Sequence, residues 1–445
     1  MKEPGRDQPP AAVPPKANQA GQVRDRWSWT EPSVWTDRML TALENGVKGG
    51  VWFSLIDKVY SPRNLRSAFE KVKANRGAAG VDHQTIEVFA EQLEANLGRL
   101  EEELRTGRYR PQAVRRTYIP KSGGKELRPL GIPTVRDRVA QAAVRQVLEP
   151  IFEREFAAHS YGFRPGRSCK DALRRVSGLL EAGYVWVVDA DLKSYFDSIP
   201  HKRLMERVKT RVADSRVLGL VESYLRQQVM ETARWWTPEE GTPQGAVVSP
   251  LLSNIYLDGL DHAMACAGYE MVRYADDFVI LCRSEQEARQ ALEHVRQWTH
   301  EAGLTLHPDK TRIVDASQKG GFDFLGYHFE RGYRWPSDKS LRKLRDTLRP
   351  KTGRNNGQSL NAIIANVNGT LRGWLEYFKH SHYTALRNVD RWVRMRLRSI
   401  QRRRHGLRGR GRGADHQRWP NAYFETRGLL SLLTAQGILR QSPRG

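Results

Sequence analysis

The chain has 445 residues, a formal net charge of +23 at pH 7 and a hydrophobic content of 39%. This excess of positive charge predicts attraction to a nucleic acid, although a basic structural protein of the ribosomal kind would share it. Three cysteines without a CxxC pair exclude a disulfide framework and a zinc ribbon, and no run reaches the roughly 18 apolar residues of a membrane span. We therefore expect a protein that does not enter a membrane and that is cytoplasmic, or nuclear or organellar if its host is a eukaryote.

The N-terminal part of the chain, residues 1–50, is predicted to be a disordered or poorly ordered extension. Its first residues are rich in proline and polar side chains, which bury too little surface to offset chain entropy. Helices are expected from residue 61 onward, because apolar residues recur every three or four positions over 61–72 and again over 86–104. The apolar pattern over 86–104 predicts one long helix.

Two short strands are predicted in the middle of the chain, at residues 185–188 and within 271–282, with helices beside them over 139–156 and 285–302. Short strands interspersed with helices indicate an α+β fold, with helices on one side of a small antiparallel sheet. Residues 338–357 are polar and basic and are predicted to be a linker.

The C-terminal part resumes a helical pattern after this linker. Apolar residues over 360–378 predict an amphipathic helix or helix pair. Residues 387–412 then hold eleven arginines against one acid, Asp390. Arginines interleaved with Trp374 and Trp392 offer phosphate contacts and stacking surfaces for RNA.

The motif Tyr-Ala-Asp-Asp at residues 274–277 lies between two strand-like runs, where an ordinary β-hairpin turn would also place aspartates. The strand at 185–188 likewise runs into carboxylates, including Asp191. Carboxylates at the ends of apolar strands are costly to bury unless a cation compensates them. If the two strands are neighbours, Asp191 and Asp276 can converge on Mg²⁺ ions, which suit in-line phosphoryl transfer.

These segments resemble motifs of a known family. Residues 274–277 resemble the catalytic box of reverse transcriptases, and residues 191–197 resemble their first metal-binding motif. Further segments are similar, in the same order, to motifs of bacterial group II intron-encoded reverse transcriptases, namely residues 128–138, 160–168, 241–257, 303–311 and 322–327. The resemblance implies a right-hand polymerase, with fingers and palm over 51–337 and an α-helical thumb or maturase domain over 338–445.

The resemblance also assigns roles to individual residues. Asp191, Asp276 and Asp277 would be the catalytic residues and would hold two Mg²⁺ ions, for which Mn²⁺ can substitute. Phe196 would be an aromatic gate that excludes a ribose 2′-hydroxyl, with a core role as the alternative. Lys310 would donate a proton to pyrophosphate or would be a plain surface lysine.

Four more residues are expected to bind the incoming nucleotide, in addition to Phe196 and Lys310. Lys121 and Arg128 would grip the triphosphate, unless they belong to a solvated basic loop. Gln244 would line the nucleotide pocket beside Gly245, where the backbone can approach closely. Ala246 departs from the family, which more often has a second glycine there.

The resemblance implies group II intron RNA, an RNA template with a DNA primer, target DNA and dNTPs as partners, and it leaves homodimerisation open. Arginines of the basic stretch are expected to contact RNA, namely Arg391, Arg394, Arg398, Arg402, Arg403 and Arg404. A thumb that clamps any primer–template duplex is the alternative. The cysteine pairs of an HNH endonuclease do not follow Gly428, so we expect no such domain.

Two other functions are consistent with parts of this pattern. A host-domesticated reverse transcriptase could serve defence or CRISPR adaptation, but the maturase-like segment after Ser359 argues against it. A splicing factor that has lost polymerisation would bind RNA alone. The presence of all three aspartates argues against that second alternative.

Overall fold

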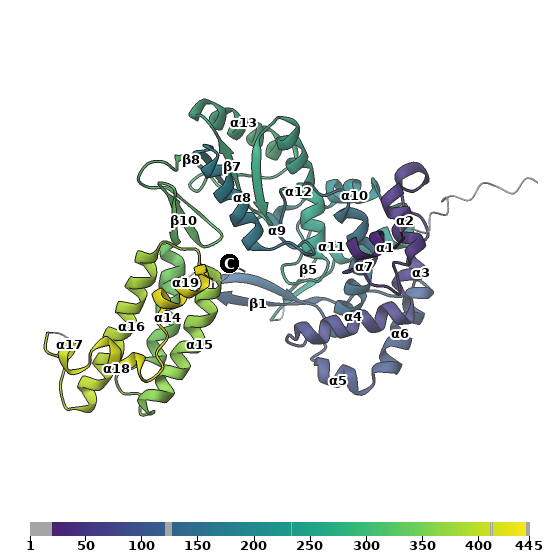
Figure 1. The fold of residues 1–445 in the computed structure, drawn as a ribbon. Helices are drawn as coiled ribbons and strands as arrows, with labels where there is room; N and C mark the ends of the chain where they lie inside the picture. The colour runs from purple at the N-terminus through teal and green to yellow at the C-terminus, as the bar shows by residue number, and fades with distance from the viewer. Residues whose placement is uncertain (1–19, 121–126, 233, 410, 412, 442–445) are drawn as a thin grey trace, which may run out of the picture.

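The protein is described here from a computed structural model that covers residues 20–120, 127–232, 234–409, 411 and 413–441. These residues form an α+β fold in which helices surround small sheets, as the sequence predicted. In Figure 1 a helix-rich part on the right leads through a central sheet to a helical unit at the lower left.

The prediction of a disordered extension is wrong for residues 20–50, which form α1 (Ala20–Arg26), α2 (Asp37–Asn45) and the 3₁₀ helix η1 (Lys48–Gly50). Trp27 and Trp35 are buried, and Trp35 Nε1 donates to the carbonyl of Gln146 at 3.0 Å. Burial of such large side chains offsets the entropy of ordering the segment, which the proline-rich leader cannot do. Residues 1–19 lie outside the described residues.

The helix-rich part is built around α7 (Val135–Glu153), most of which is buried. It contacts α3 (Ile56–Val59), α4 (Pro62–Asn75) and α6 (Leu93–Arg105). The same hydrophobic core includes residues of α5 (Ile86–Glu91), α10 (His201–Lys209) and α11 (Ser215–Leu225). The apolar stripe over 86–104 therefore forms two helices and not one. They divide at Gln92, whose φ of −120° and ψ of 40° are not helical.

A four-stranded sheet projects from this part and is called the hairpin sheet. It has the order β2–β1–β4–β5, with β1 (Val114–Pro120), β2 (Leu127–Ile132), β4 (Val229–Glu231) and β5 (Arg234–Trp236). Strands β1 and β2 are antiparallel, whereas β1 and β4 run parallel. Figure 1 shows the β1–β2 hairpin extending toward the helical unit.

The central sheet has the order β6–β7–β3–β8, and all its neighbouring strands are antiparallel. Its strands are β3 (Trp186–Asp191), β6 (Glu270–Tyr274), β7 (Asp277–Cys282) and β8 (Arg312–Asp315). Both predicted strand segments are confirmed by this sheet. The predicted helices beside them are confirmed as α7 and α13 (Glu285–Glu301).

The expectation that helices cover one side of this sheet is wrong, because both faces are covered. Helices α12 (Ser249–Cys266) and α13 contact one face, and α8 (Cys169–Glu181) contacts the other. Along β7, Phe278 and Ile280 belong to one core cluster, while Val279 and Leu281 belong to another. A continuous apolar run is the pattern of a strand that is buried on both faces.

Three short strands connect the central sheet to the helical unit, namely β9 (Phe322–Phe324), β10 (Tyr327–Glu330) and β11 (Tyr333–Pro336). The predicted linker over 338–357 is wrong for most of its length, since α14 (Asp338–Lys351) begins directly after β11. Leu344 and Leu348 of α14 are buried, because leucines spaced three or four residues apart form one apolar face.

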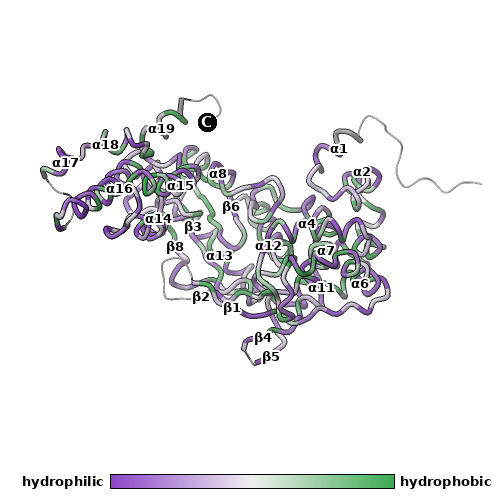
Figure 2. The backbone as a smooth tube through the Cα atoms, turned by 90° about the horizontal axis from the view of Figure 1, so that it is seen from below, coloured by the Kyte–Doolittle hydropathy of each residue, from purple (hydrophilic) through white to green (hydrophobic). Residues whose placement is uncertain are grey.

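The helical unit, residues 338–441, also contains α15 (Leu360–Phe378), α16 (Tyr383–Arg404), α17 (Asp415–Arg418), α18 (Asn421–Glu425) and α19 (Leu432–Gln441). Helix α15 confirms the amphipathic helix predicted over 360–378, and the unit has its own hydrophobic core. Figure 2 shows long hydrophilic stretches along α14 and α16. Among the described residues, no helix is long and apolar enough to cross a membrane.

Helix α19 is fastened to α16 through the buried side chain of Asp390. This carboxylate accepts hydrogen bonds from the backbone N–H groups of Leu432 at 3.0 Å and Leu433 at 3.3 Å. The hydroxyl of Ser431 donates a third, at 3.0 Å. The only acid of the arginine-rich stretch is thus a structural group whose burial is compensated by three donors.

Candidate active site

The β6–β7 hairpin carries the motif Tyr-Ala-Asp-Asp at its turn. Tyr274 and Asp277 face each other in the antiparallel register, and Ala275 between them adopts a left-handed φ of 60°. On the other side of β7, Asp277 lies opposite Asp191, the last residue of β3. The structure therefore brings the predicted aspartates, including Asp276 in the turn, to one end of the central sheet.

The carboxylates of this cluster repel one another. Burial raises the pKa of Asp277 to about 7, and the charges of neighbouring aspartates, including Asp189 and Asp276, add to the rise. Burial also raises the pKa of Asp276, to which the charge of Asp191 contributes. Like charges in a buried site favour protonation unless a cation joins them, so oxygen donors of this kind fit a divalent ion.

The carboxylates do not form a closed cage. Among the described residues, no group of three or more His, Cys, Asp or Glu side chains is arranged to hold one metal ion. Mg²⁺ typically uses one or two protein carboxylates and completes its shell with water and substrate phosphates. Aspartates that leave part of the ion's shell open therefore match an ion that is bound together with a nucleotide.

Lys310 contacts this cluster directly. Its Nζ donates to Oδ2 of Asp191 at 2.7 Å, and the backbone N–H of His307, from the same turn, donates to the carbonyl of Asp191 at 2.7 Å. The lysine side chain is 61% exposed. In this structure Lys310 therefore pairs with an aspartate of the cluster.

Phe196 lies close to the aspartates in the short helix α9 (Tyr195–Ser198), just after β3. Its ring is half-buried and contacts that of Tyr195, with centroids 5.6 Å apart. Its carbonyl accepts a hydrogen bond from the backbone N–H of Thr242 at 2.6 Å. The segment that contains Gln244 is thereby attached to the residue predicted to be the gate.

Gln244 and Gly245 connect this segment to the hairpin sheet. The backbone N–H of Gly131 in β2 donates to the carbonyl of Gln244 at 2.7 Å. Gly245 has a φ of +105°, and a Cβ there would lie 2.6 Å from the carbonyl oxygen of Gly131. Only glycine fits this close approach.

Arg128, also on β2, is exposed and lies near enough to Asp276 for its positive charge to lower the pKa of that aspartate. Lys121 lies outside the described residues.

Three residues of this region were not predicted to belong to a site. Gln244 Nε2 donates to Oδ2 of Asp197 at 3.3 Å, so Asp197 lies beside a predicted pocket residue. Asp197 and Gln244 also line a cavity of about 620 Å³, together with Arg116 and Trp236. The Arg116 guanidinium lies 5.4 Å from the Trp236 ring centroid. The two adjacent tryptophans at residues 235 and 236 were the available signal in the sequence.

The arginines predicted to contact RNA lie on α16, but they differ in exposure. Arg391, Arg403 and Arg404 are exposed, although Arg404 also donates to the carbonyl of Gln358. Arg402 pairs with Asp415 at 2.6 Å. A further ion pair joins Arg394 to Glu425 at 3.6 Å.

Arg398 corrects the prediction that this whole series contacts RNA. It is 3% exposed, and its guanidinium donates to the carbonyl of Trp419 at 2.9 Å and to Oδ1 of Asn421 at 2.8 Å. Because this guanidinium donates to buried acceptors, it holds α16 against the segment that contains Trp419 and Asn421. Residue spacing alone could not separate this inward-facing arginine from its exposed neighbours.

Comparisons with known proteins agree with this arrangement. A family model described as reverse transcriptase (RNA-dependent DNA polymerase) matches residues 119–329, and one described as the group II intron maturase-specific domain matches 341–419. The protein YkfC of Escherichia coli K12 is 32% identical over 382 residues, which make up 77% of this chain and 94% of that protein.

Two further proteins are similar to only part of this chain. The group II intron-encoded protein LtrA of Lactococcus lactis is 39% identical over 196 residues, which are 44% of this chain and 32% of LtrA. A solved structure titled a partial Cas6-RT-Cas1–Cas2 complex is 27% identical, covers 56% of this chain and 41% of that chain, and has a TM-score of 0.36. The extensive match to YkfC, together with both domain matches, decides the family. This chain belongs to the group II intron-encoded proteins that join a reverse transcriptase to a maturase domain, and it is an RNA-directed DNA polymerase.

Proposed function

We propose that this polymerase copies group II intron RNA into DNA, with Asp191, Asp276 and Asp277 as the ligands of two Mg²⁺ ions. The observation that carries the proposal is the pairing of β3 with β7, which sets Asp191 opposite Asp277 and beside the turn that bears Asp276. When bound, the ions would activate the primer 3′-hydroxyl and neutralise charge on the leaving pyrophosphate. Mn²⁺ is expected to substitute for Mg²⁺.

The surrounding side chains would bind and orient the nucleotide. Arg128 can hold phosphate oxygens with its planar fork, and Lys121 would add a point charge. Phe196 would lie beneath the sugar and exclude a 2′-hydroxyl. Gln244 and Gly245 would form the adjoining wall of the pocket.

Lys310 would act only after a change of partner. In the structure it neutralises Asp191, so it must leave that carboxylate before an ion can take its place. Its ammonium group would then be available to protonate the pyrophosphate. The pairing therefore supports a role for Lys310 at the site that depends on nucleotide binding.

We further propose that residues 338–445 form the thumb and maturase domain, which binds the intron RNA and assists its splicing, and that residues 51–337 form the fingers and palm. The separate hydrophobic core of the helical unit supports this division. Exposed arginines on α16, Arg391 and Arg403, would contact RNA phosphates. Target DNA would receive the copied sequence, and the cysteine content favours the cytoplasm as the compartment.

The polymerase proposal is tested by extending a DNA primer on an RNA template with purified full-length protein, dNTPs and Mg²⁺. Extension is expected, it should stop on chelation with EDTA, and it should return with either Mg²⁺ or Mn²⁺. Extension that continues without any divalent ion would overturn the metal-dependent mechanism.

The intron proposal needs a separate measurement. RNA that copurifies with the protein from its native cells should be sequenced after gentle crosslinking. One dominant structured intron is the expected result. A mixture that mirrors cellular RNA abundance would contradict a dedicated intron partner and would leave the polymerase result untouched.

A further inference from the structure

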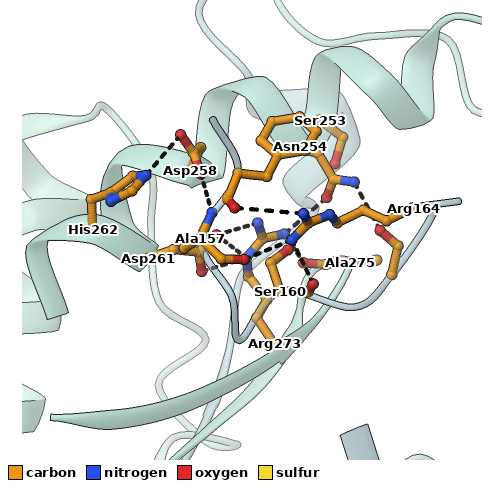
Figure 3. A network of polar contacts seen from close by, with 12 residues as sticks. Ala157, Ser160, Arg164, Ser253, Asn254, Asp258, Asp261, His262, Arg273 and Ala275 are labelled. Carbon is orange, nitrogen blue, oxygen red and sulfur yellow. Dashed lines mark hydrogen bonds and ion pairs between the residues drawn. The ribbon is translucent and has the colours of Figure 1, made fainter. Parts of the chain in front are cut away.

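A fully buried arginine lies directly behind the catalytic turn. Arg273, in β6, is 0% exposed and donates from Nη1 to the carbonyl of Ala275 at 2.8 Å. The same nitrogen donates to Oδ1 of Asn254 at 3.0 Å, and Nε donates to Oδ1 of Asp261 at 2.8 Å. Figure 3 shows these groups converging from β6 and α12. The guanidinium therefore links the turn to the helix that covers the sheet.

This arrangement uses features that arginine alone provides. Burial by itself would lower the pKa of Arg273, but the charge of Asp261 more than offsets this, so the guanidinium stays ionised. Its planar fork can serve Asp261, Asn254 and Ala275 in different directions at once. A lysine at this position would keep the charge but could not reproduce all three contacts.

A neighbouring loop pairs with the edge of β6 beside the turn. The backbone N–H of Tyr161 donates to the carbonyl of Arg273 at 2.8 Å. Gly162 lies against Ala275 so closely that a Cβ would clash with its backbone nitrogen. Asn254 Nδ2 also donates to the carbonyl of Gly162 at 2.8 Å, so one amide side chain contacts both the arginine and the loop.

The loop is itself held by a second buried guanidinium. Arg164 is 6% exposed, pairs with Glu153 at 2.7 Å and donates to the carbonyl of Ser160 at 2.9 Å. Figure 3 shows Arg164 and Arg273 side by side in this network. The turn is therefore held by contacts to a loop and, through Arg273, to a helix, and an arginine fixes each of them.

We propose that Arg273 is a positioning residue for the metal site. By holding the Ala275 carbonyl, it keeps that non-glycine residue in its left-handed conformation and so sets where the carboxylates of Asp276 and Asp277 point. This inference rests on the proposed role of those aspartates as metal ligands. A purely structural ion pair would stabilise the fold without influencing ion affinity.

The test measures ion binding directly, with Mn²⁺ as the probe and electron paramagnetic resonance as the readout. Full-length protein is titrated in complex with an RNA template, a dideoxy-terminated primer and the next dNTP. Arg273→Lys, and Arg273→Gln combined with Asp261→Asn, avoid leaving an uncompensated buried charge. Both should raise the apparent Kd for Mn²⁺ by about 10- to 100-fold, as loss of groups that orient metal ligands does.

The matched control is Arg398→Gln, which removes an arginine that is equally buried but lies in the helical unit. It should lower the melting temperature and leave Mn²⁺ affinity within about twofold, well below the change expected at the metal site. The Arg273 variants should bind the primer–template duplex as the wild type does, and their kcat should fall with their Mn²⁺ affinity.

The outcomes separate this inference from the function on which it rests. If the Arg273 variants melt earlier but bind Mn²⁺ as tightly as the wild type, the positioning role is wrong. The Arg273→Lys variant keeps this test available should the double variant fail to fold. If Asp276→Ala also binds Mn²⁺ with wild-type affinity, the error lies instead in the assignment of the metal ligands.

Discussion

The turn at Asp276 and Asp277 and the helical unit both withdraw aspartates from water, but they surround them with different groups. In the helical unit, Asp390 is compensated by three hydrogen-bond donors. At the turn, Asp276 and Asp277 are partly buried, and the charges of neighbouring carboxylates add to the rise in pKa that burial causes. A buried charge with its own partners is structural, whereas a cluster of like charges marks a site that is completed by a ligand.

The largest effect is expected at the turn that bears Asp276 and Asp277, the first region of this comparison. Asp276→Ala should lower primer extension by at least ~1,000-fold, equivalent to about 4 kcal/mol, because the site would lose a metal ligand. The variant should not melt earlier than the wild type, since the substitution removes one of several mutually repelling buried charges. Asp346→Ala, which changes an exposed aspartate in α14, should extend primers normally. A stable, fully active Asp276→Ala enzyme would end the assignment.

Arg398 tests the other region of this comparison, the helical unit, because it is also a buried charged group with its own hydrogen-bond partners. Arg398→Ala should lower the free energy of unfolding by about 2–3 kcal/mol, because two acceptors lose their donor in a buried setting. Arg403→Ala, at an exposed position of the same helix, should stay within about 0.5 kcal/mol of the wild type. Denaturant unfolding measures both. Equal stabilities would mean that the contacts of Arg398 contribute nothing.

Sugar selectivity gives an effect of intermediate size. Phe196→Ala, or the milder Phe196→Val, should raise the relative kcat/KM for ribonucleotides by about 10- to 100-fold, because a bulky ring no longer meets the 2′-hydroxyl. Single-nucleotide incorporation with matched dNTP and NTP measures the ratio, and the dNTP rate of the same variant is its internal control. An unchanged ratio would assign the half-buried ring to the core.

The smallest effect concerns RNA affinity. Replacing Arg391 and Arg403 together by alanine should reduce the slope of log K against log salt by about 2, one for each lost phosphate contact. Arg398→Ala removes one of the same charges from α16 but should leave the slope unchanged, since its guanidinium is buried. Filter binding of intron RNA across a salt series provides the data. Equal slopes for the double variant and the wild type would contradict the phosphate contacts.

The carboxylate cluster could be predicted from the sequence because each part has a local signature. Apolar strand residues run directly into Asp191, and a short turn separates two further strands at Asp276. Their meeting required only that β3 and β7 be neighbours, which the sheet order confirms. The fold class followed for the same reason, since short strands alternate with helical patterns.

The arginine network could not be predicted in the same way. Arg273 contacts partners 12 and 19 residues away on another element, and the loop beside it comes from still earlier in the chain. Nothing in a local pattern distinguishes an inward-facing arginine from a phosphate-binding one. In a chain with 73 lysines and arginines, composition favours the second interpretation everywhere, which also explains the error at Arg398.

Two other errors had usable signals. Residues 20–50 contain Trp27, Trp29 and Trp35, an aromatic density that indicates a buried segment more than a disordered one. In α14, leucines at 341, 344 and 348 have helical spacing, but the surrounding basic residues suggested a linker. In both segments overall polarity was given more weight than the spacing of a few large apolar side chains.

The fastening of α19 to α16 limits how far the protein can be shortened. All three donors to Asp390 come from residues 431–433. A chain cut before residue 431 would withdraw them and leave that carboxylate in a largely apolar interior, at a cost of about 3–5 kcal/mol for a broken buried partnership. The arginine-rich helix would lose its packing partner at the same time. Deletion from this end would therefore damage the helix that is proposed to face RNA, even though none of its exposed arginines had been removed.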